Sequence, residues 1–132
     1  MIKPVNATTV NFNGRLRKGF LSQNMMKNFS ESELLEYKGL ISKLENTPDG
    51  RVFSLLRGRK IDSCDGRDYH DFYQFVEMNP ETADTFLPLS YCVKEVLSEK
   101  TFLSQKGYKT QTFPKACVDV ILEPLRKIYG GK

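Results

Sequence analysis

Residues 29–56, FSESELLEYKGLISKLENTPDGRVFSLL, contain the signals of a helix, a turn and a strand in direct succession. Ser30 and Glu33 match the S-x-x-E pattern of a capping box, in which each residue bonds the backbone N–H of the other. Phe29 and Leu34 stand at the two positions of a hydrophobic staple. Two independent local signals therefore predict that a helix begins at Ser30.

The same stretch also predicts where that helix ends and which element comes next. Apolar residues recur at helical spacing over 34–44, and the helix is expected to end near Asn46. Residues 47–50 read Thr-Pro-Asp-Gly, which is turn chemistry. Residues 51–56 form a short apolar run bounded by turns, which predicts a buried strand. The segment is thus predicted to contain a helix, a turn and a strand in succession.

Upstream of this stretch, the dipeptide Asn13-Gly14 separates residues 9–12 from residues 15–17. Asn-Gly favours the positive φ angles of a tight β-turn, so an N-terminal hairpin is expected. A second interpretation stays open, because residues 1–30 contain no Asp or Glu and acid-poor N-termini are typical of some targeting signals.

Downstream, Asp65-Gly66 is a second turn signal between residues 60–64 and 68–76. These two runs would form a hairpin and continue the strand over 51–56 into a meander. The alternative is a short helix capped by Asp68, because apolar residues within 69–76 also fit helical spacing. Composition favours the strand, and we predict it.

The C-terminal part of the chain has helical spacing in two segments. The first is expected to end near Gly107, and its apolar positions are Leu89, Val93, Val96, Leu97 and Leu103. The second covers 113–128, with a kink or a break expected at Pro124. We therefore predict a single globular domain over residues 1–132 of the α+β class. Its small antiparallel sheet, made of the N-terminal hairpin and the central strands, would pack against three or four helices.

The lengths of the apolar runs and the cysteine spacing indicate the cellular compartment of the protein. No apolar run approaches the roughly 18 residues that a membrane-spanning helix needs, and no signal-peptide pattern opens the chain. Cys64, Cys92 and Cys117 are odd in number and fit no metal or redox spacing. We expect buried, reduced thiols at Cys92 and Cys117. The sequence thus predicts a cytoplasmic protein with no membrane contact, while secretion by a route other than Sec stays open.

Charge alternates in blocks along the chain, although the net charge is only +4. Two basic clusters are the candidate binding residues for an anionic partner: Arg15, Arg17 and Lys18, and Arg57, Arg59 and Lys60. If the fold brought the clusters together, they would attract phosphates or an acidic protein surface. The alternative is that basic and acidic blocks pair with each other on a solvated surface.

An acidic segment lies directly after the second cluster. Its weak candidates for a metal site are Asp62, Asp65, Asp68, His70 and Asp71. Aspartates concentrated in a loop can bind hard cations, but their spacing of three does not match an EF-hand, and turn and cap roles explain them. Cys64 and His70 are the one conceivable nucleophile and base pair, and His70 is the only histidine. We expect no metal and no cofactor.

By elimination, the sequence favours a small non-enzymatic protein-interaction domain of bacterial or phage type, whose partner is another protein. The alternative is a nucleic-acid-binding domain that uses the basic clusters at 15–18 and 57–60. A small enzyme or metal-binding protein centred on residues 62–71 is the third possibility. The oligomeric state is not indicated by any pattern.

Overall fold

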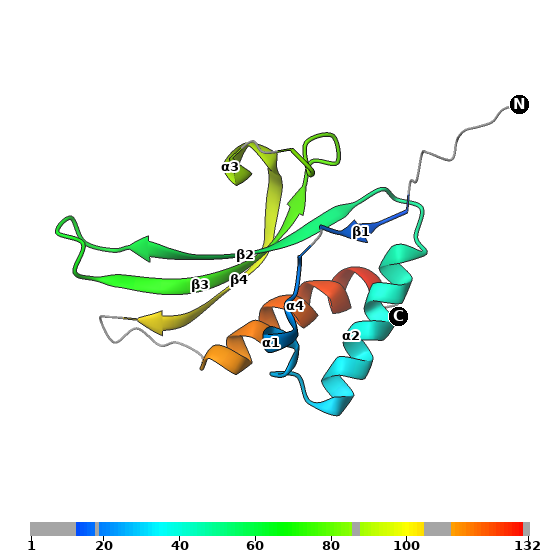
Figure 1. The fold of residues 1–132 in the computed structure, drawn as a ribbon, viewed down its shortest axis with the longest axis horizontal. Coiled ribbons are helices and arrows are strands. Elements are labelled where there is room, and N and C mark those ends of the chain that lie inside the picture. The colour runs from blue at the N-terminus through cyan, green and yellow to red at the C-terminus, as the bar shows by residue number, and fades with distance from the viewer. Residues whose placement is uncertain (1–12, 18, 86–87, 105–111, 131–132) are drawn as a thin grey trace, which may run out of the picture.

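A computed structural model describes residues 13–17, 19–85, 88–104 and 112–130 of the chain. The described residues form an α+β fold in which a four-stranded sheet has the order β1-β2-β3-β4 (Figure 1). The elements in chain order are β1 (Arg15–Leu16), α1 (Gln23–Met26), α2 (Glu31–Glu45), β2 (Val52–Ile61), β3 (Tyr69–Met78), α3 (Leu89–Cys92), β4 (Val93–Ser104) and α4 (Phe113–Tyr129).

Helix α2 begins and ends where its local signals predict. The Ser30 Oγ accepts a hydrogen bond from the Glu33 N–H at 3.2 Å, and the Ser30 N–H donates to the Glu33 Oε1 at 2.9 Å. Asn46 is the C-cap, and its side-chain amide donates to the Ser42 carbonyl at 2.8 Å. The capping box is therefore confirmed, and it satisfies backbone donors that the first helical turn leaves without partners.

We expect Ser30→Ala to lower the free energy of unfolding by about 0.5–2 kcal/mol, because it removes the acceptor for the Glu33 N–H. The measurement is urea denaturation followed by circular dichroism. The control is Ser42→Ala, an exposed serine inside the same helix. A denaturation midpoint that Ser30→Ala leaves unchanged, with the same m-value, would contradict the capping role.

Strands β2 and β3 form one long antiparallel hairpin. The register runs without a shift from Val52 opposite Met78 to Ile61 opposite Tyr69, so the strand predicted over 68–76 is confirmed. A separate strand over 60–64 is wrong, because β2 continues through Gly58 to Ile61. Gly58 is not a turn residue: a Cβ there would lie 2.9 Å from the Phe72 Cζ, so the glycine makes room for that ring.

The predicted N-terminal hairpin is not confirmed in the described residues. Residues 9–12, its first arm, lie outside the described residues, and the second arm pairs elsewhere. Arg15 and Leu16 lie parallel to Val52 and Phe53, so the sheet is mixed rather than antiparallel. Gly14 is buried, and a Cβ on it would lie 2.7 Å from the Leu44 carbonyl oxygen. This glycine therefore allows close approach to the end of α2 instead of closing a turn.

Strand β4 replaces the helix that was predicted to end near Gly107, so that prediction is wrong. The strand pairs antiparallel with β3, and the register shifts at three places, between Asp71 and Phe72, Phe75 and Val76, and Glu77 and Met78. Each shift adds an extra residue to β4 and breaks the two-residue alternation of a strand. The apolar positions then fall at spacings that resemble those of a helix.

Helix α4 confirms the helix predicted over 113–128, and it runs from Phe113 to Tyr129. The expectation at Pro124 was a kink or a break; the break is wrong, because the helix continues through that residue, and the kink stays a prediction. Pro124 is itself buried, between Ile121 and Leu125, which are fully buried in the main core. Packing on both sides of the proline thus holds the helix together where one backbone hydrogen bond is missing.

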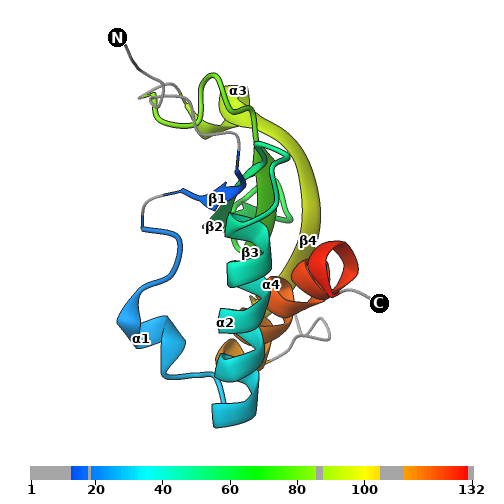
Figure 2. The same ribbon diagram turned by 90° about the vertical axis from the view of Figure 1, so that its right-hand side faces the viewer.

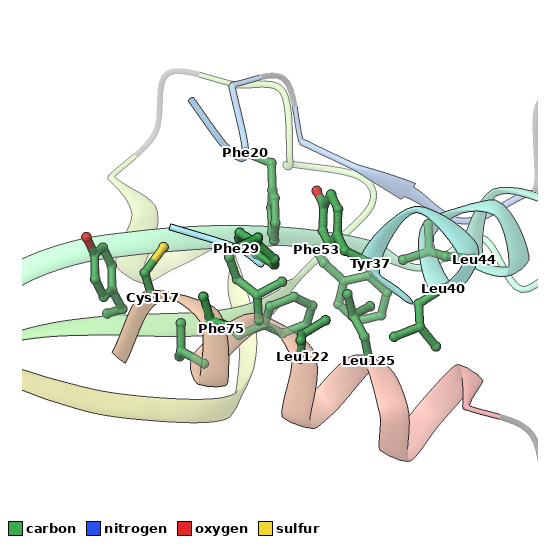
Figure 3. Packing of buried hydrophobic residues seen from close by; sticks show 14 of the residues in the cluster. Phe20, Phe29, Tyr37, Leu40, Leu44, Phe53, Phe75, Cys117, Leu122 and Leu125 are labelled. Atoms are coloured by element: carbon green, nitrogen blue, oxygen red, sulfur yellow. The ribbon is translucent and has the colours of Figure 1, made fainter. Parts of the chain in front are cut away.

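The main core lies between one face of the sheet and the helices. Helix α4 packs against β3, β4 and α2, and Figure 2 shows α2 and α4 on the same side of the molecule. Aromatic rings fill the centre, with the Phe75 centroid 5.4 Å from that of Phe53 and 5.6 Å from that of Phe20. Figure 3 labels these cluster members: Phe20, Phe29, Tyr37, Leu40, Leu44, Phe53, Phe75, Cys117, Leu122 and Leu125.

A second, smaller buried cluster gathers where the connection between β3 and β4 folds back on the sheet. Its buried members are Val52, Val76, Met78, Ala83 and Cys92. In β2 and β3 these residues alternate with members of the main core, so the two clusters lie on opposite faces of the sheet. In the described part of the chain, no helix is long and apolar enough to cross a membrane.

The three thiols are expected to react at different rates with a thiol reagent. Cys64 is exposed, whereas Cys92 and Cys117 are buried. The Cys92 Sγ donates to the Thr82 carbonyl at 3.3 Å, and burial raises the pKa of Cys117 to about 11. A reagent that needs a thiolate should therefore modify Cys64 first. All three should react quickly in denaturant, and fast modification of Cys117 in the native protein would contradict the assignment.

Candidate functional site

The outer edge of β2 is open beyond its first residues. β1 pairs only with Val52 and Phe53, and the Arg17 N–H then donates to the Phe53 carbonyl at 2.8 Å. The chain next turns at Gly19, where φ is +79°, and leads to α1. From Leu55 onward, no other described strand pairs with this edge of β2. Figure 1 shows this half of the β2–β3 hairpin extending past β1.

Arg57 lies on this open segment above an aromatic platform. Its Cζ is 5.6 Å from the centroid of the Phe102 ring and 5.8 Å from that of Phe113. The side chain is exposed, and none of the ion pairs among the described residues includes it. Aromatic faces favour a cation electrostatically without neutralising its charge. Arg57 therefore lies over both rings without a carboxylate partner in the described part of the chain.

Tyr73 forms the buried floor of that platform. It is opposite Arg57 on β3, it is fully buried, and its ring stacks on Phe102 at 4.6 Å between centroids. Its hydroxyl has no hydrogen-bond partner among the described residues, and burial raises the pKa of Tyr73 to about 12. Tyr73 is thus a buried, stacked aromatic ring opposite the exposed Arg57.

Arg59, two residues further along β2, is neutralised inside the hairpin. Its guanidinium donates two hydrogen bonds to the Asp71 carboxylate, at 2.7 and 3.4 Å, across the β2–β3 ladder. Its Cζ also lies 4.0 Å from the centroid of the Tyr69 ring. Like Arg57, Arg59 lies over an aromatic ring, but its charge is paired with the Asp71 carboxylate.

Lys60 lies on the opposite face of the sheet. Its Nζ donates to the Glu99 Oε2 at 2.7 Å and sits 5.0 Å from the centroid of the Phe72 ring. The Gln74 amide donates to the same oxygen at 2.7 Å. Burial acts to raise the pKa of Glu99, but these two hydrogen bonds and the attraction of nearby charges, Lys60 first, together lower the pKa overall. The third cation of this cluster is therefore paired as well.

The two basic clusters do not converge. Arg15 lies opposite Val52, five positions before Arg57 on the same strand, which is about 17 Å at the rise of a β-strand. Arg15 is also paired, because its Nη2 donates to the Asp84 Oδ2 at 2.6 Å. Lys18 lies outside the described residues. The fold thus separates the cations that the sequence grouped and pairs several of them with carboxylates.

The acidic loop at the tip of the hairpin uses its carboxylates locally. Asp62 and His70 bond to each other at 3.0 Å. Asp65 accepts from the Ser63 hydroxyl at 2.7 Å, a bond that lowers the pKa of Asp65. Within the described ranges, no three Asp, Glu, Cys or His side chains are placed to hold a metal ion. Cys64 is exposed in this loop.

A polar cluster that the sequence interpretation missed lies at the other end of β2. The Arg51 guanidinium donates two hydrogen bonds to Glu77, at 2.7 and 3.1 Å, and the Tyr129 hydroxyl donates to Asp49 at 3.1 Å. A hollow of about 620 Å³ lies beside them, lined in part by Lys43 and Tyr129. The signal was a charged Glu77 within a run of apolar strand residues. The groups are paired with one another, so we assign them a structural role.

No protein-family model, curated protein or solved structure matches this chain. The function is therefore argued from the surface chemistry of the described residues. The feature that offers unused binding capacity is the open edge of β2 together with Arg57. We call this segment, residues 55–61, the open edge.

Proposed function

We propose that the chain is a protein-interaction domain that binds an acidic segment of another protein at the open edge. The observation that carries the proposal is Arg57, an exposed arginine fixed over two aromatic rings with no carboxylate partner among the described residues. A preorganised cation loses little side-chain freedom when it binds, which favours charge-based recognition. Arginine and aromatic side chains are also the residues enriched in protein–protein interfaces.

The charge distribution favours a protein partner over a nucleic acid. Binding to a phosphate backbone gains affinity from several cations that each release counterions. Arg15, Arg59 and Lys60 are already paired with Asp84, Asp71 and Glu99. Arg17 and Arg57 are the cluster arginines without an ion pair among the described residues. Two such arginines, with an acidic loop beside Arg57, suit one or two carboxylates of a peptide better than a run of phosphates.

The proposal is tested by selection from a random peptide library displayed on phage, with the whole chain immobilised. We expect the selected peptides to be enriched in Asp and Glu, and Arg57→Glu to weaken their binding roughly tenfold or more. The matched control is Lys94→Glu, which makes the same change of charge at an exposed residue on β4, at the opposite edge of the sheet.

Two outcomes would overturn the proposal. One is a selection without acidic enrichment, or selected peptides that bind Arg57→Glu as tightly as the parent. The other is tighter binding of a 20-residue single-stranded RNA or a DNA duplex of the same length, with an affinity that falls steeply as salt rises, because that behaviour identifies a nucleic-acid-binding domain.

A further inference from the structure

The backbone of the open edge presents unused hydrogen-bonding groups in a regular pattern. The carbonyls of Arg51 and Phe53 point away from β3, because they accept the Arg15 and Arg17 N–H groups of the neighbouring segment. The Asp62 N–H instead donates to the Asp68 carbonyl on the β3 side. Backbone groups alternate along a strand, so the odd-numbered residues of β2 point outward. On the open edge these are Leu55, Arg57, Arg59 and Ile61.

No described residue satisfies those outward groups. The backbone hydrogen bonds of the described loops and caps include none with residues 55–61, and among the described strands only β3 lies beside this half of β2. The segment is about 20 Å long at the rise of a β-strand, which is the length of an ordinary strand. Ile61 at its end is 57% exposed. The open edge is thus long enough to pair with one more strand.

The charge of the open edge favours an acidic strand of another protein over a second copy of this chain. A second copy pairing through the same segment would bring a second unpaired Arg57 onto the adjacent strand, and like charges on adjacent strands are unfavourable. A strand with a carboxylate beside Arg57 would instead supply the partner that this arginine lacks among the described residues. Charge complementarity therefore favours an acidic strand and disfavours self-association.

We infer that the open edge binds an extended acidic segment of the partner as a fifth β-strand, with a carboxylate beside Arg57. This inference rests on the proposed function and adds the mode of binding. Backbone hydrogen bonds to the four outward residues would supply affinity, and Arg57 would select a carboxylate at the neighbouring position of the added strand. Neighbouring side chains on one face of a strand are two residues apart, so a peptide with Glu at alternate residues can present one of them beside Arg57.

The first test measures amide hydrogen exchange of the whole chain by NMR. In the free protein, the amides of the even-numbered residues 56, 58 and 60 should exchange slowly, because they face β3, and those of Arg57, Arg59 and Ile61 should exchange quickly. A nine-residue peptide that alternates Glu and Thr, with blocked ends, should then slow the exchange of the odd-numbered amides at least tenfold. Protection confined to other elements would overturn the inference.

The second test changes the peptide backbone while keeping its charges. N-methylation of the alternate peptide residues that face β2 should abolish binding, whereas N-methylation of the other alternate set should leave the affinity within about threefold, because those N–H groups point to solvent. One set must therefore be sensitive and the other tolerant. Equal sensitivity of both sets would overturn the strand-addition mode.

The two proposals fail in different ways. If acidic peptides are selected and lose affinity for Arg57→Glu, but N-methylation of either set has the same effect, the proposed function stands and the binding mode is wrong. If the Glu-Thr peptide and a Lys-Thr peptide of the same length bind equally, charge recognition fails and both proposals fall. Lys94→Glu is again the control for net charge.

Discussion

Phe75→Ala is expected to lower the free energy of unfolding by about 3–5 kcal/mol, the largest effect that we predict for a single substitution. Phe75 is fully buried, and its ring contacts Phe53 and Phe20 at the centre of the main core. Alanine would remove that buried surface and leave a cavity between the sheet and the helices, which surrounding side chains fill only in part. The loss is a substantial fraction of the stability of a domain of this size.

The measurement is urea denaturation followed by circular dichroism, with stability compared at a common m-value. Leu35→Ala is the control, because Leu35 is 73% exposed on α2 and alanine is a good helix former. We expect the control to change stability by less than about 0.5 kcal/mol. A Phe75→Ala variant that is as stable as the control would show that the ring does not occupy the core.

Glu77→Ala is the second large effect, with an expected loss of about 2–3 kcal/mol. The Glu77 side chain is only 8% exposed and accepts both hydrogen bonds of the Arg51 guanidinium. Without the carboxylate, Arg51 would keep a charge in a half-buried position with no partner for its donors. Because the Arg51 side chain is 30% exposed, water would accept some of its hydrogen bonds and reduce the loss of stability.

A double substitution separates the contribution of the Arg51–Glu77 ion pair to stability from that of side-chain packing. Arg51→Met combined with Glu77→Leu should recover most of the stability lost in Glu77→Ala, because a buried ion pair is about as stable as apolar side chains of similar volume. Glu123→Ala provides a surface control, since it removes the exposed partner of Lys100 and should cost less than about 1 kcal/mol. If the Glu77 and Glu123 variants are equally stable, the Arg51–Glu77 pair is no stronger than a surface pair.

Helices α2 and α4 were predictable because their signals are local. Ser30 and Glu33 are three residues apart, and their reciprocal hydrogen bonds form within one helical turn, whatever the rest of the chain does. The apolar stripe of α4 has helical spacing over the whole range that becomes a helix. Sequence reasoning left a kink and a break open at Pro124, because only the packing of α4 shows that the helix continues there.

The candidate site was predicted only in part. Arg57 was among the residues expected to bind an anionic partner, because a basic cluster can be seen in the sequence. The sequence grouped it with Arg59 and Lys60 by neighbourhood alone. The fold pairs Arg59 with Asp71 and Lys60 with Glu99, and these partners are 12 and 39 residues away along the chain. Which cation stays free depends on these distant carboxylates.

The amino-acid sequence by itself determined the α+β class, both ends of α2 and the extent of α4, because capping, turn chemistry and helical periodicity act over a few residues. Only the tertiary structure decided that residues 93–104 form a strand, since β3 needs a partner along that edge and three bulges hide the strand period. It also decided that Gly14 serves a close contact with the Leu44 carbonyl instead of a turn. Contacts between distant segments carry no local signal, so strand pairing and the open edge became visible only in the fold.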